Sequence, residues 1–170
     1  NSKVQRPGVC NALETLLINR KVYNTMGRDI ISKLIDNNVE LFVDRDIKKD
    51  FPSLKEVNDI HFATEFHDLK LAIGIVDTLD EAIGHIQKYS SGHTEGIISE
   101  SAEVTEKFSK SIDSSVIFIN TSTRFTDGEM FGFGAEVGIS TQKLHVRGPM
   151  GLEALTSERY VVTTEGMARE

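Results

Sequence analysis

The strongest constraint on the fold is a regular alternation of short apolar runs with amphipathic helical patterns. Apolar runs at Lys70–Val76, Glu95–Ser99 and Val116–Asn120 are predicted strands. The segments between them, Leu79–Tyr89 and Ala102–Ile112, repeat apolar residues with a helical period. Strands separated by helices of this length are typical of βαβ units around a parallel sheet. The sequence therefore predicts an α/β fold.

The N-terminal part of the chain extends this pattern. Good helix formers follow a Pro-Gly break, so we predict a helix that begins at Cys10 or Asn11 and ends at Asn19. A second helix is predicted over Tyr23–Asp36 and a further strand over Glu40–Val43. Cys10 would then lie at the N-terminal end of a helix.

Beyond Asn120 the alternation stops. A glycine-rich polar segment, Thr121–Gly138, leads into a tail in which Tyr160–Thr164 alternates like a strand. A terminal strand without a partner in the parallel sheet is an exposed edge unless another chain pairs with it. The sequence therefore predicts a subunit contact through the tail.

Composition excludes several classes of protein. A chain of 170 residues that is 39% hydrophobic can bury one core. The net charge of −7 argues against nucleic acids and anionic membranes as partners. One cysteine allows no intramolecular disulfide and fits a reducing compartment, so we expect the cytoplasm. The chain starts without Met and is interpreted as a fragment of a longer polypeptide.

Cys10 is the first candidate for chemistry. A lone cysteine in such a protein is commonly a small, inert, buried side chain. At a helix start, however, unpaired N–H groups and the helix dipole stabilise a thiolate and lower its pKa. The same N–H groups can hold an oxyanion at an attacked acyl carbon. Inert burial and nucleophilic catalysis both remain open at this point.

Other features are weaker. The glycines of Phe131–Gly138 lack the strand-to-helix context of a dinucleotide fingerprint and are interpreted as a loop that approaches a ligand or a neighbouring domain. The five histidines show no metal-ligand spacing, so we expect no metal. Glu65 by itself is most simply a solvated charge.

Taken together, three blocks resemble a known family, and they span the chain from Arg6 to Leu155. They are Arg6–Leu17, the signature from Val76 to Ile97 with Ser90-Ser91-Gly92-His93-Thr94-Glu95, and Asn120–Gly128 with Gly134–His145 and Arg147–Leu152. They resemble the γ-glutamyl phosphate reductases (glutamate-5-semialdehyde dehydrogenases) of the aldehyde dehydrogenase superfamily. The third block is specific to this family.

The resemblance implies a three-layer parallel-sheet catalytic domain of the aldehyde dehydrogenase type over residues 1–150 and an oligomerisation tail over residues 151–170. The dinucleotide-binding domain of the family is expected to lie outside this chain. The implied reaction is the NADPH-dependent reduction of L-glutamyl 5-phosphate to L-glutamate 5-semialdehyde and phosphate in proline biosynthesis.

The resemblance also implies roles for single residues. Cys10 is the expected nucleophile, which forms a thioacyl intermediate. Glu65 matches the superfamily glutamate that contacts the nicotinamide ribose. The candidate substrate-binding residues are Asn11, Ser122, Thr123 and Arg124. Arg124 is expected to pair with an anionic group of the substrate, and the alternative is a structural ion pair.

Two alternatives remain open. The chain could be the reductase portion of a bifunctional pyrroline-5-carboxylate synthase, or a folded module that is inactive in isolation because its hydride source lies elsewhere. The expected partners are the small-molecule substrate, a second copy of the chain bound through the tail, and glutamate 5-kinase through functional coupling.

Overall fold

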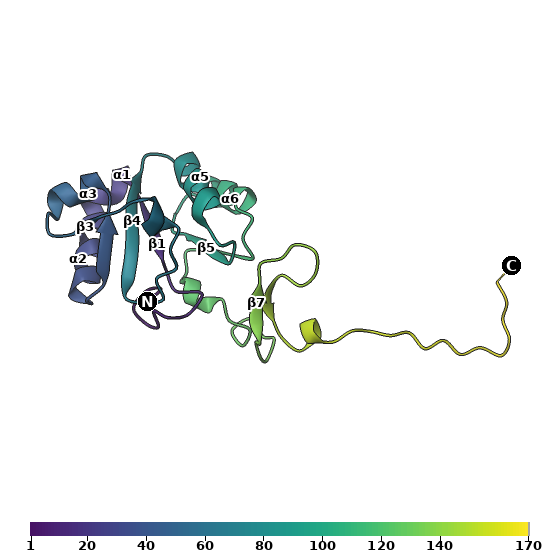
Figure 1. Ribbon diagram of the computed structural model, residues 1–170. Coiled ribbons are helices and arrows are strands. Elements are labelled where there is room, and N and C mark those ends of the chain that lie inside the picture. The colour runs from purple at the N-terminus through teal and green to yellow at the C-terminus, as the bar shows by residue number, and fades with distance from the viewer. Residues whose placement is uncertain (170) are drawn as a thin grey trace.

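The structure is a computed structural model that describes residues 1–169, and its elements are arranged around parallel strands (Figure 1). In chain order they are β1 (Thr15–Asn19), α1 (Arg20–Val22), the π-helical turn η1 (Tyr23–Gly27), α2 (Arg28–Asp36), β2 (Glu40–Val43), α3 (Arg45–Asp50), β3 (Lys55–Glu56), α4 (Asp59–Phe62), β4 (Lys70–Val76), α5 (Leu79–Tyr89), β5 (Thr94–Ile97), α6 (Ala102–Ser111), β6 (Val116–Ile119), the 3-10 turn η2 (Thr123–Phe125), β7 (Gly138–Ser140), β8 (Gly148–Met150) and the 3-10 turn η3 (Glu153–Leu155).

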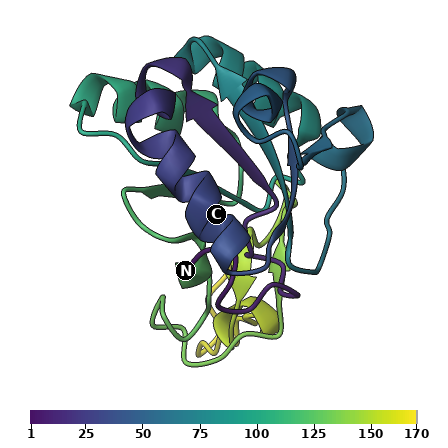
Figure 2. The same ribbon diagram turned by 90° about the vertical axis from the view of Figure 1, so that its left-hand side faces the viewer.

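The main sheet has four parallel strands in the order β1-β4-β2-β3. Because successive side chains of a strand point to opposite faces, Leu71 and Ile73 of β4 share one face. Ile31 of α2 and Ile47 of α3 pack with them, and all four are fully buried. In Figure 2, α2 runs in front of the strands on this face.

The opposite face of the sheet is covered by α4 and α5. Phe42 of β2 stacks on His61 of α4, with ring centroids 4.0 Å apart. Phe62 of α4 lies against Gly74 of β4 and meets His85 of α5 edge-on at 4.5 Å. Helices on both faces of a parallel sheet give the expected three layers, so the predicted fold class is confirmed.

A second, smaller sheet follows. Its strands β5 and β6 pair in parallel, and the antiparallel hairpin β7-β8 comes after them. Ile83 of α5 packs with Phe108 of α6 and Ile112 in a separate small core. The predicted strand Glu40–Val43 and the predicted strands and helices from Lys70 to Asn120 are confirmed to within one or two residues at each end. The stretch between Val43 and Lys70 was expected to be irregular, but it forms α3, β3 and α4, and the β7-β8 hairpin was not foreseen either.

The predicted helix from Cys10 to Asn19 is wrong. Thr15–Asn19 is strand β1, which pairs in parallel with β4. Leu16 and Ile18 contribute to the main core, and this burial outweighs the helix propensity of the local sequence. Cys10 consequently lies in a turn before a strand and has no helix behind it.

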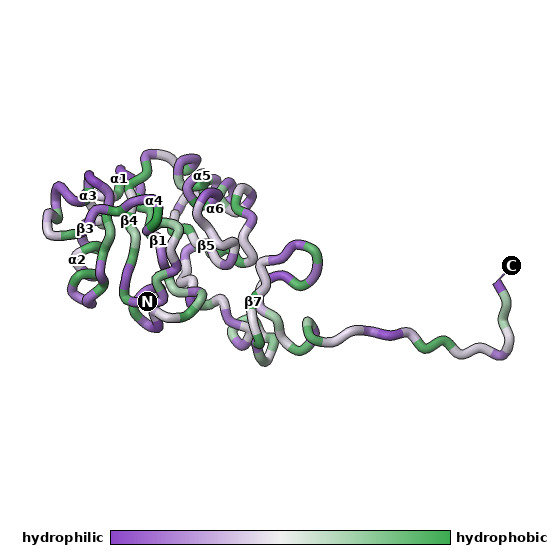
Figure 3. The backbone as a smooth tube through the Cα atoms, in the orientation of Figure 1, coloured by the Kyte–Doolittle hydropathy of each residue, from purple (hydrophilic) through white to green (hydrophobic). Residues whose placement is uncertain are grey.

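The tail forms no helix or strand between Thr156 and Arg169, so the predicted strand is not formed within this chain. It leads away from the rest of the molecule (Figure 1), and a hydrophobic stretch interrupts its polar sequence (Figure 3). Among residues 1–169, no helix has the length and apolar character needed to cross a membrane.

Candidate active site

Cys10 lies in a reverse turn, where the N–H of Ala12 donates to the carbonyl oxygen of Val9 at 3.0 Å. The residue is exposed. The N–H groups of Cys10 and Asn11, at the centre of this turn, donate to no other backbone group in the described part of the chain. The turn thus presents N–H donors beside the thiol, although no helix dipole supports them.

The electrostatic surroundings of Cys10 differ from the prediction. Although much of the residue is exposed, its thiol is partly shielded from water, and this shielding is the main cause that raises the pKa of Cys10. The carboxylates of Glu136 and Glu65 raise the pKa further, while the residue's own N–H and Arg124 lower it. The predicted fall in pKa depended on a helix start, and that start is absent.

Asn11 connects the Cys10 turn to the chain around η2. Its side chain is buried, and Nδ2 donates to the carbonyl oxygen of Thr126 at 2.7 Å. Its Oδ1 accepts a hydrogen bond from Nη1 of Arg124. Its carbonyl oxygen accepts from the hydroxyl of Thr123 at 2.7 Å. With both amide atoms bonded, Asn11 is placed to position its neighbours.

Arg124 is held by neutral groups. Its Nε donates to Oε1 of Gln5 at 3.1 Å, in addition to the bond to Asn11. Within residues 1–169 no carboxylate forms an ion pair with Arg124, so the alternative of a structural ion pair is not realised there. A guanidinium without a bound carboxylate can accept an anionic ligand, because it retains N–H donors and its full charge.

The other predicted residues are nearby. The hydroxyl of Ser122 accepts from the N–H of Arg124 at 3.2 Å and donates to Oδ1 of Asn1 at 2.7 Å. It also lies 2.9 Å from the hydroxyl of Ser2. The structure therefore brings together Cys10 and all four candidate substrate-binding residues from two segments that lie far apart in the sequence.

Glu65 lies in the loop between α4 and β4. Its side chain is 53% exposed, and Oε2 is 3.4 Å from Nε2 of His67. A side chain at Gly8, two residues before Cys10, would contact the carbonyl oxygen of His67 at 3.4 Å. The Glu65 loop therefore lies against the Cys10 turn, and its carboxylate acts on the thiol.

The sequence did not single out Glu136 or Thr126 as site residues, and it left open whether His93 faces the site or is an ordinary loop histidine. The hydroxyl of Thr126 lies 2.8 Å from that of Thr94, which lies 2.7 Å from Nδ1 of His93. Burial lowers the pKa of His93, whose Nε2 is buried without a partner among residues 1–169. All of these residues fall within the blocks that carry the family resemblance, and this was the feature of the sequence that could have pointed to them.

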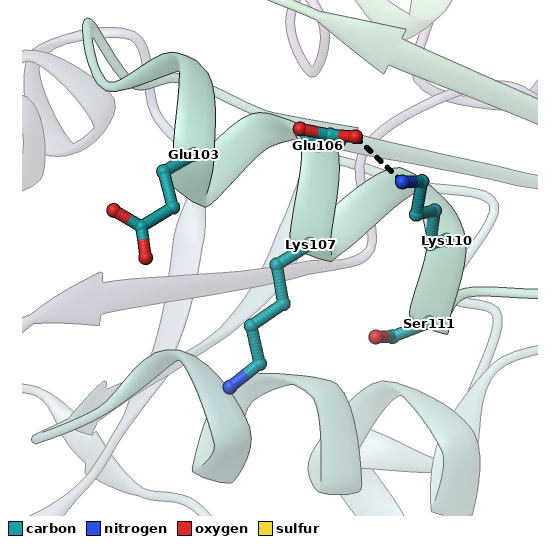
Figure 4. A pocket seen from close by; sticks show the side chains of 5 residues that line it. All are labelled: Glu103, Glu106, Lys107, Lys110 and Ser111. Atoms are coloured by element: carbon teal, nitrogen blue, oxygen red, sulfur yellow. Dashed lines mark hydrogen bonds and ion pairs between the residues drawn. The ribbon is translucent and has the colours of Figure 1, made fainter.

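A hollow on the outer face of α6 is a different feature (Figure 4). Three of its four charged side chains already pair, since Lys110 lies 2.5 Å from Glu106 and Lys107 lies 2.6 Å from Asp80 of α5. It contains none of the residues around Cys10. We therefore place the candidate active site at the Cys10 turn.

Known proteins resemble this chain over its whole length. No protein-family model matches it. Gamma-glutamyl phosphate reductase of Thermoanaerobacter sp. (strain X514) is 49% identical over 170 residues, which are 100% of this chain and 41% of that protein. The crystal structure of gamma-glutamyl phosphate reductase from Thermotoga maritima superposes with a TM-score of 0.93 at 44% identity, again over 100% of this chain and 41% of that one.

A more distant structure shows the fold alone. Propionaldehyde dehydrogenase from Clostridium phytofermentans is 12% identical, with a TM-score of 0.56 over 84% of this chain and 40% of that chain. The fold is thus that of aldehyde dehydrogenase-type enzymes. The chain spans 41% of the length of its curated relatives, and over that span it resembles gamma-glutamyl phosphate reductase in both sequence and fold.

Proposed function

We propose that this chain supplies the nucleophile and the substrate-binding residues of a reductase that converts L-glutamyl 5-phosphate and NADPH into L-glutamate 5-semialdehyde, phosphate and NADP⁺. The observation that carries the proposal is the placement of the Arg124 guanidinium beside the Cys10 turn, where it is hydrogen-bonded to Asn11 and its charge acts on the Cys10 thiol. An acyl phosphate needs a nucleophile for its carbon and a cation for its anionic groups. The resemblance to gamma-glutamyl phosphate reductases supports this substrate class.

In the first step, the sulfur of Cys10 forms a bond to the acyl carbon while the bond from that carbon to the phosphate oxygen breaks. Phosphate leaves with the electron pair, and a thioester remains on Cys10. The turn N–H groups of Cys10 and Asn11 are the candidates to hold the oxyanion at the acyl carbon. Arg124 would pair with a carboxylate or phosphate oxygen of the substrate.

Glu65 is suited to a nicotinamide cofactor. Its exposed carboxylate beside the Cys10 turn can accept hydrogen bonds from ribose hydroxyls. NADPH bound there would supply the hydride that reduces the thioester to the aldehyde level. Release of the aldehyde then breaks the bond between carbon and sulfur and returns Cys10 as a thiolate.

The test uses the full-length protein in the reverse direction, because the aldehyde is easier to handle than the acyl phosphate. We expect repeated turnover of glutamate 5-semialdehyde and NADP⁺ to NADPH only when phosphate is present, and at most one NADPH per active site when it is absent, because the thioester on Cys10 then cannot be released. Cys10→Ser should abolish it, and mass spectrometry should detect a glutamyl adduct on the Cys10 peptide of the wild type when phosphate is withheld. Activity that persists in Cys10→Ser would refute the proposed role.

We further propose that the tail pairs with a neighbouring subunit. Tyr160, Val161 and Val162 are 87%, 76% and 83% exposed, and such an apolar stretch is stabilised when another chain covers it. Removal of the residues after Leu155 should lower the molecular mass measured by sedimentation. An unchanged oligomeric mass would contradict this assignment.

A further inference from the structure

The glycine-rich loop carries a carboxylate that the proposed reaction has not yet used. Glu136 is exposed, and its Oε2 accepts a hydrogen bond from the N–H of Gly128 at 2.9 Å. The hydrogen bond fixes one carboxylate oxygen. The other oxygen can still accept hydrogen bonds from a ligand.

Close backbone packing fixes the position of Glu136. A side chain at Gly128 would lie 2.8 Å from the carbonyl oxygen of Ala135, and one at Gly151 would lie 3.0 Å from the same oxygen. Gly128 in the glycine-rich loop and Gly151 after β8 thus allow close approach to the backbone before Glu136. The carboxylate is therefore held close to Gly128.

This position is next to the nucleophile. Gly128 follows the buried Thr126 by two residues, and the carbonyl of Thr126 holds Asn11, the neighbour of Cys10. Among the charged groups that act on the Cys10 thiol, Glu136 has the largest effect, Glu65 acts in the same direction and Arg124 opposes both. Without a ligand, the local charges thus disfavour a thiolate.

A glutamyl substrate carries an α-ammonium group in addition to its anionic groups, and no residue described above accounts for it. We propose that Glu136 binds this ammonium group while Arg124 binds an anionic group, so that the two side chains select an amino-acid substrate. The inference rests on the proposed function, which supplies the substrate class. An ammonium pairs well with a pre-positioned carboxylate.

The same contact has a consequence for reactivity. An ammonium beside Glu136 cancels the negative charge that acts most strongly on Cys10, whereas an anionic group on Arg124 cancels a weaker, opposing charge, so substrate binding lowers the pKa of the thiol. The thiol would then ionise chiefly when an amino-acid substrate is bound. Ligands of similar shape that lack the ammonium group would not produce this effect.

The test measures the alkylation rate of Cys10 by iodoacetamide against pH in the full-length protein, by quantifying the Cys10 peptide in a mass spectrometer. L-glutamate should shift the midpoint to lower pH, whereas glutarate, which lacks the amine, should not. In Glu136→Gln the midpoint without ligand should already be lower, and glutamate should shift it no further. A glutamate shift that survives in Glu136→Gln would overturn the proposal, as would the absence of any shift in the wild type.

A matched control and a second readout complete the experiment. Glu129→Gln removes a carboxylate from an exposed position of the same loop and should behave like the wild type. Glu136→Gln should raise KM for glutamate 5-semialdehyde about tenfold and leave KM for the amine-free 5-oxopentanoate unchanged. Since alkylation needs neither cofactor nor turnover, a failure of the proposed reductase activity would be seen separately from a failure of the ammonium contact.

Discussion

Nδ2 of Asn11 donates to the carbonyl oxygen of Thr126 at 2.7 Å, across a separation of 115 residues. This buried bond joins the turn that carries Cys10 to the segment that carries Arg124. Cys10 and Arg124 depend on it for their relative placement, because neither lies within a long helix or a strand.

Asn11→Ala should therefore cost stability as well as activity. The substitution leaves the buried carbonyl of Thr126 without its hydrogen-bond donor and removes the acceptor of Arg124. The free energy of unfolding should fall by about 1–3 kcal/mol as a result. Urea unfolding should report this loss. Asn24→Ala, at an exposed position of η1, should change the free energy of unfolding by less than about 0.5 kcal/mol. Equal effects of the two substitutions would show that the Asn11 bond is not structural.

Arg124→Lys tests the anion contact. A lysine keeps the charge but loses the planar fork that matches a carboxylate or phosphate, so KM for the substrate should rise about tenfold or more. Arg45→Lys is the matched control, because Arg45 is exposed on α3 and pairs with Glu56. Steady-state kinetics of the full-length protein would measure both, and an unchanged KM in Arg124→Lys would exclude the contact.

The secondary structure between Lys70 and Ile119 could be predicted because local signals agree with the tertiary fold, whereas the short elements α3, β3 and α4 before it were not predicted. Thr78 accepts from the N–H of Glu81 at 3.1 Å at the start of α5, and Ser101 accepts from the N–H of Val104 at 3.3 Å at the start of α6. Strand β1 could not be predicted in this way. Its conformation depends on pairing with β4, more than fifty residues later.

The candidate site was predicted in part. Cys10 was already a candidate as the lone cysteine, but its expected role, like that of Arg124, came from the resemblance of the surrounding blocks to a family. Glu136 was missed because its effect on Cys10 arises only when the glycine-rich loop folds back onto the Thr126 segment. The pKa of Cys10 was predicted in the wrong direction, since the sign depended on a helix that does not form.

The ion pair of Lys3 and Glu14 offers a test of the N-terminal segment. Lys3 is 3% exposed, and its Nζ lies 2.9 Å from Oε2 of Glu14. Lys3→Met leaves a shielded carboxylate without its partner and should cost about 3–5 kcal/mol. The double variant Lys3→Met/Glu14→Gln should recover much of the lost free energy of unfolding, because no unpaired carboxylate remains. Urea unfolding would measure both variants. The control Lys107→Met, which breaks an exposed pair with Asp80, should cost about 0–1 kcal/mol.

The histidine on α5 should make stability depend on pH. His85 packs against Phe62 and Tyr89, and burial, with Lys88 nearby, lowers its pKa below the ordinary value near 6.5. The contribution of neutral His85 to the stability of the folded protein is fully present above the pKa that this histidine has in the unfolded chain. It is lost as the pH falls from that value through the lower pKa of His85 in the folded protein. Thermal unfolding from about pH 7.5 to about pH 5 should show a smaller decrease for His85→Phe and His85→Gln than for the wild type. Superimposable profiles would contradict the assignment.

Two glycines should respond to alanine in opposite directions. A Cβ at Gly128 would lie 2.8 Å from the carbonyl oxygen of Ala135 and 2.9 Å from Cβ of Glu136, and neither position is found for real side chains. Gly128→Ala should therefore displace the Glu136 carboxylate and destabilise the protein by about 1–3 kcal/mol.

Gly84 is the matched control, because it is exposed within α5 and a Cβ there would meet no atom within 4 Å. Gly84→Ala should stabilise the protein by about 0.5–1 kcal/mol through helix propensity and leave the kinetics unchanged. Thermal unfolding and the glutamate-induced change in Cys10 alkylation would be measured on both variants. Retention of that change in Gly128→Ala would show that the packing at Gly128 is not what positions Glu136.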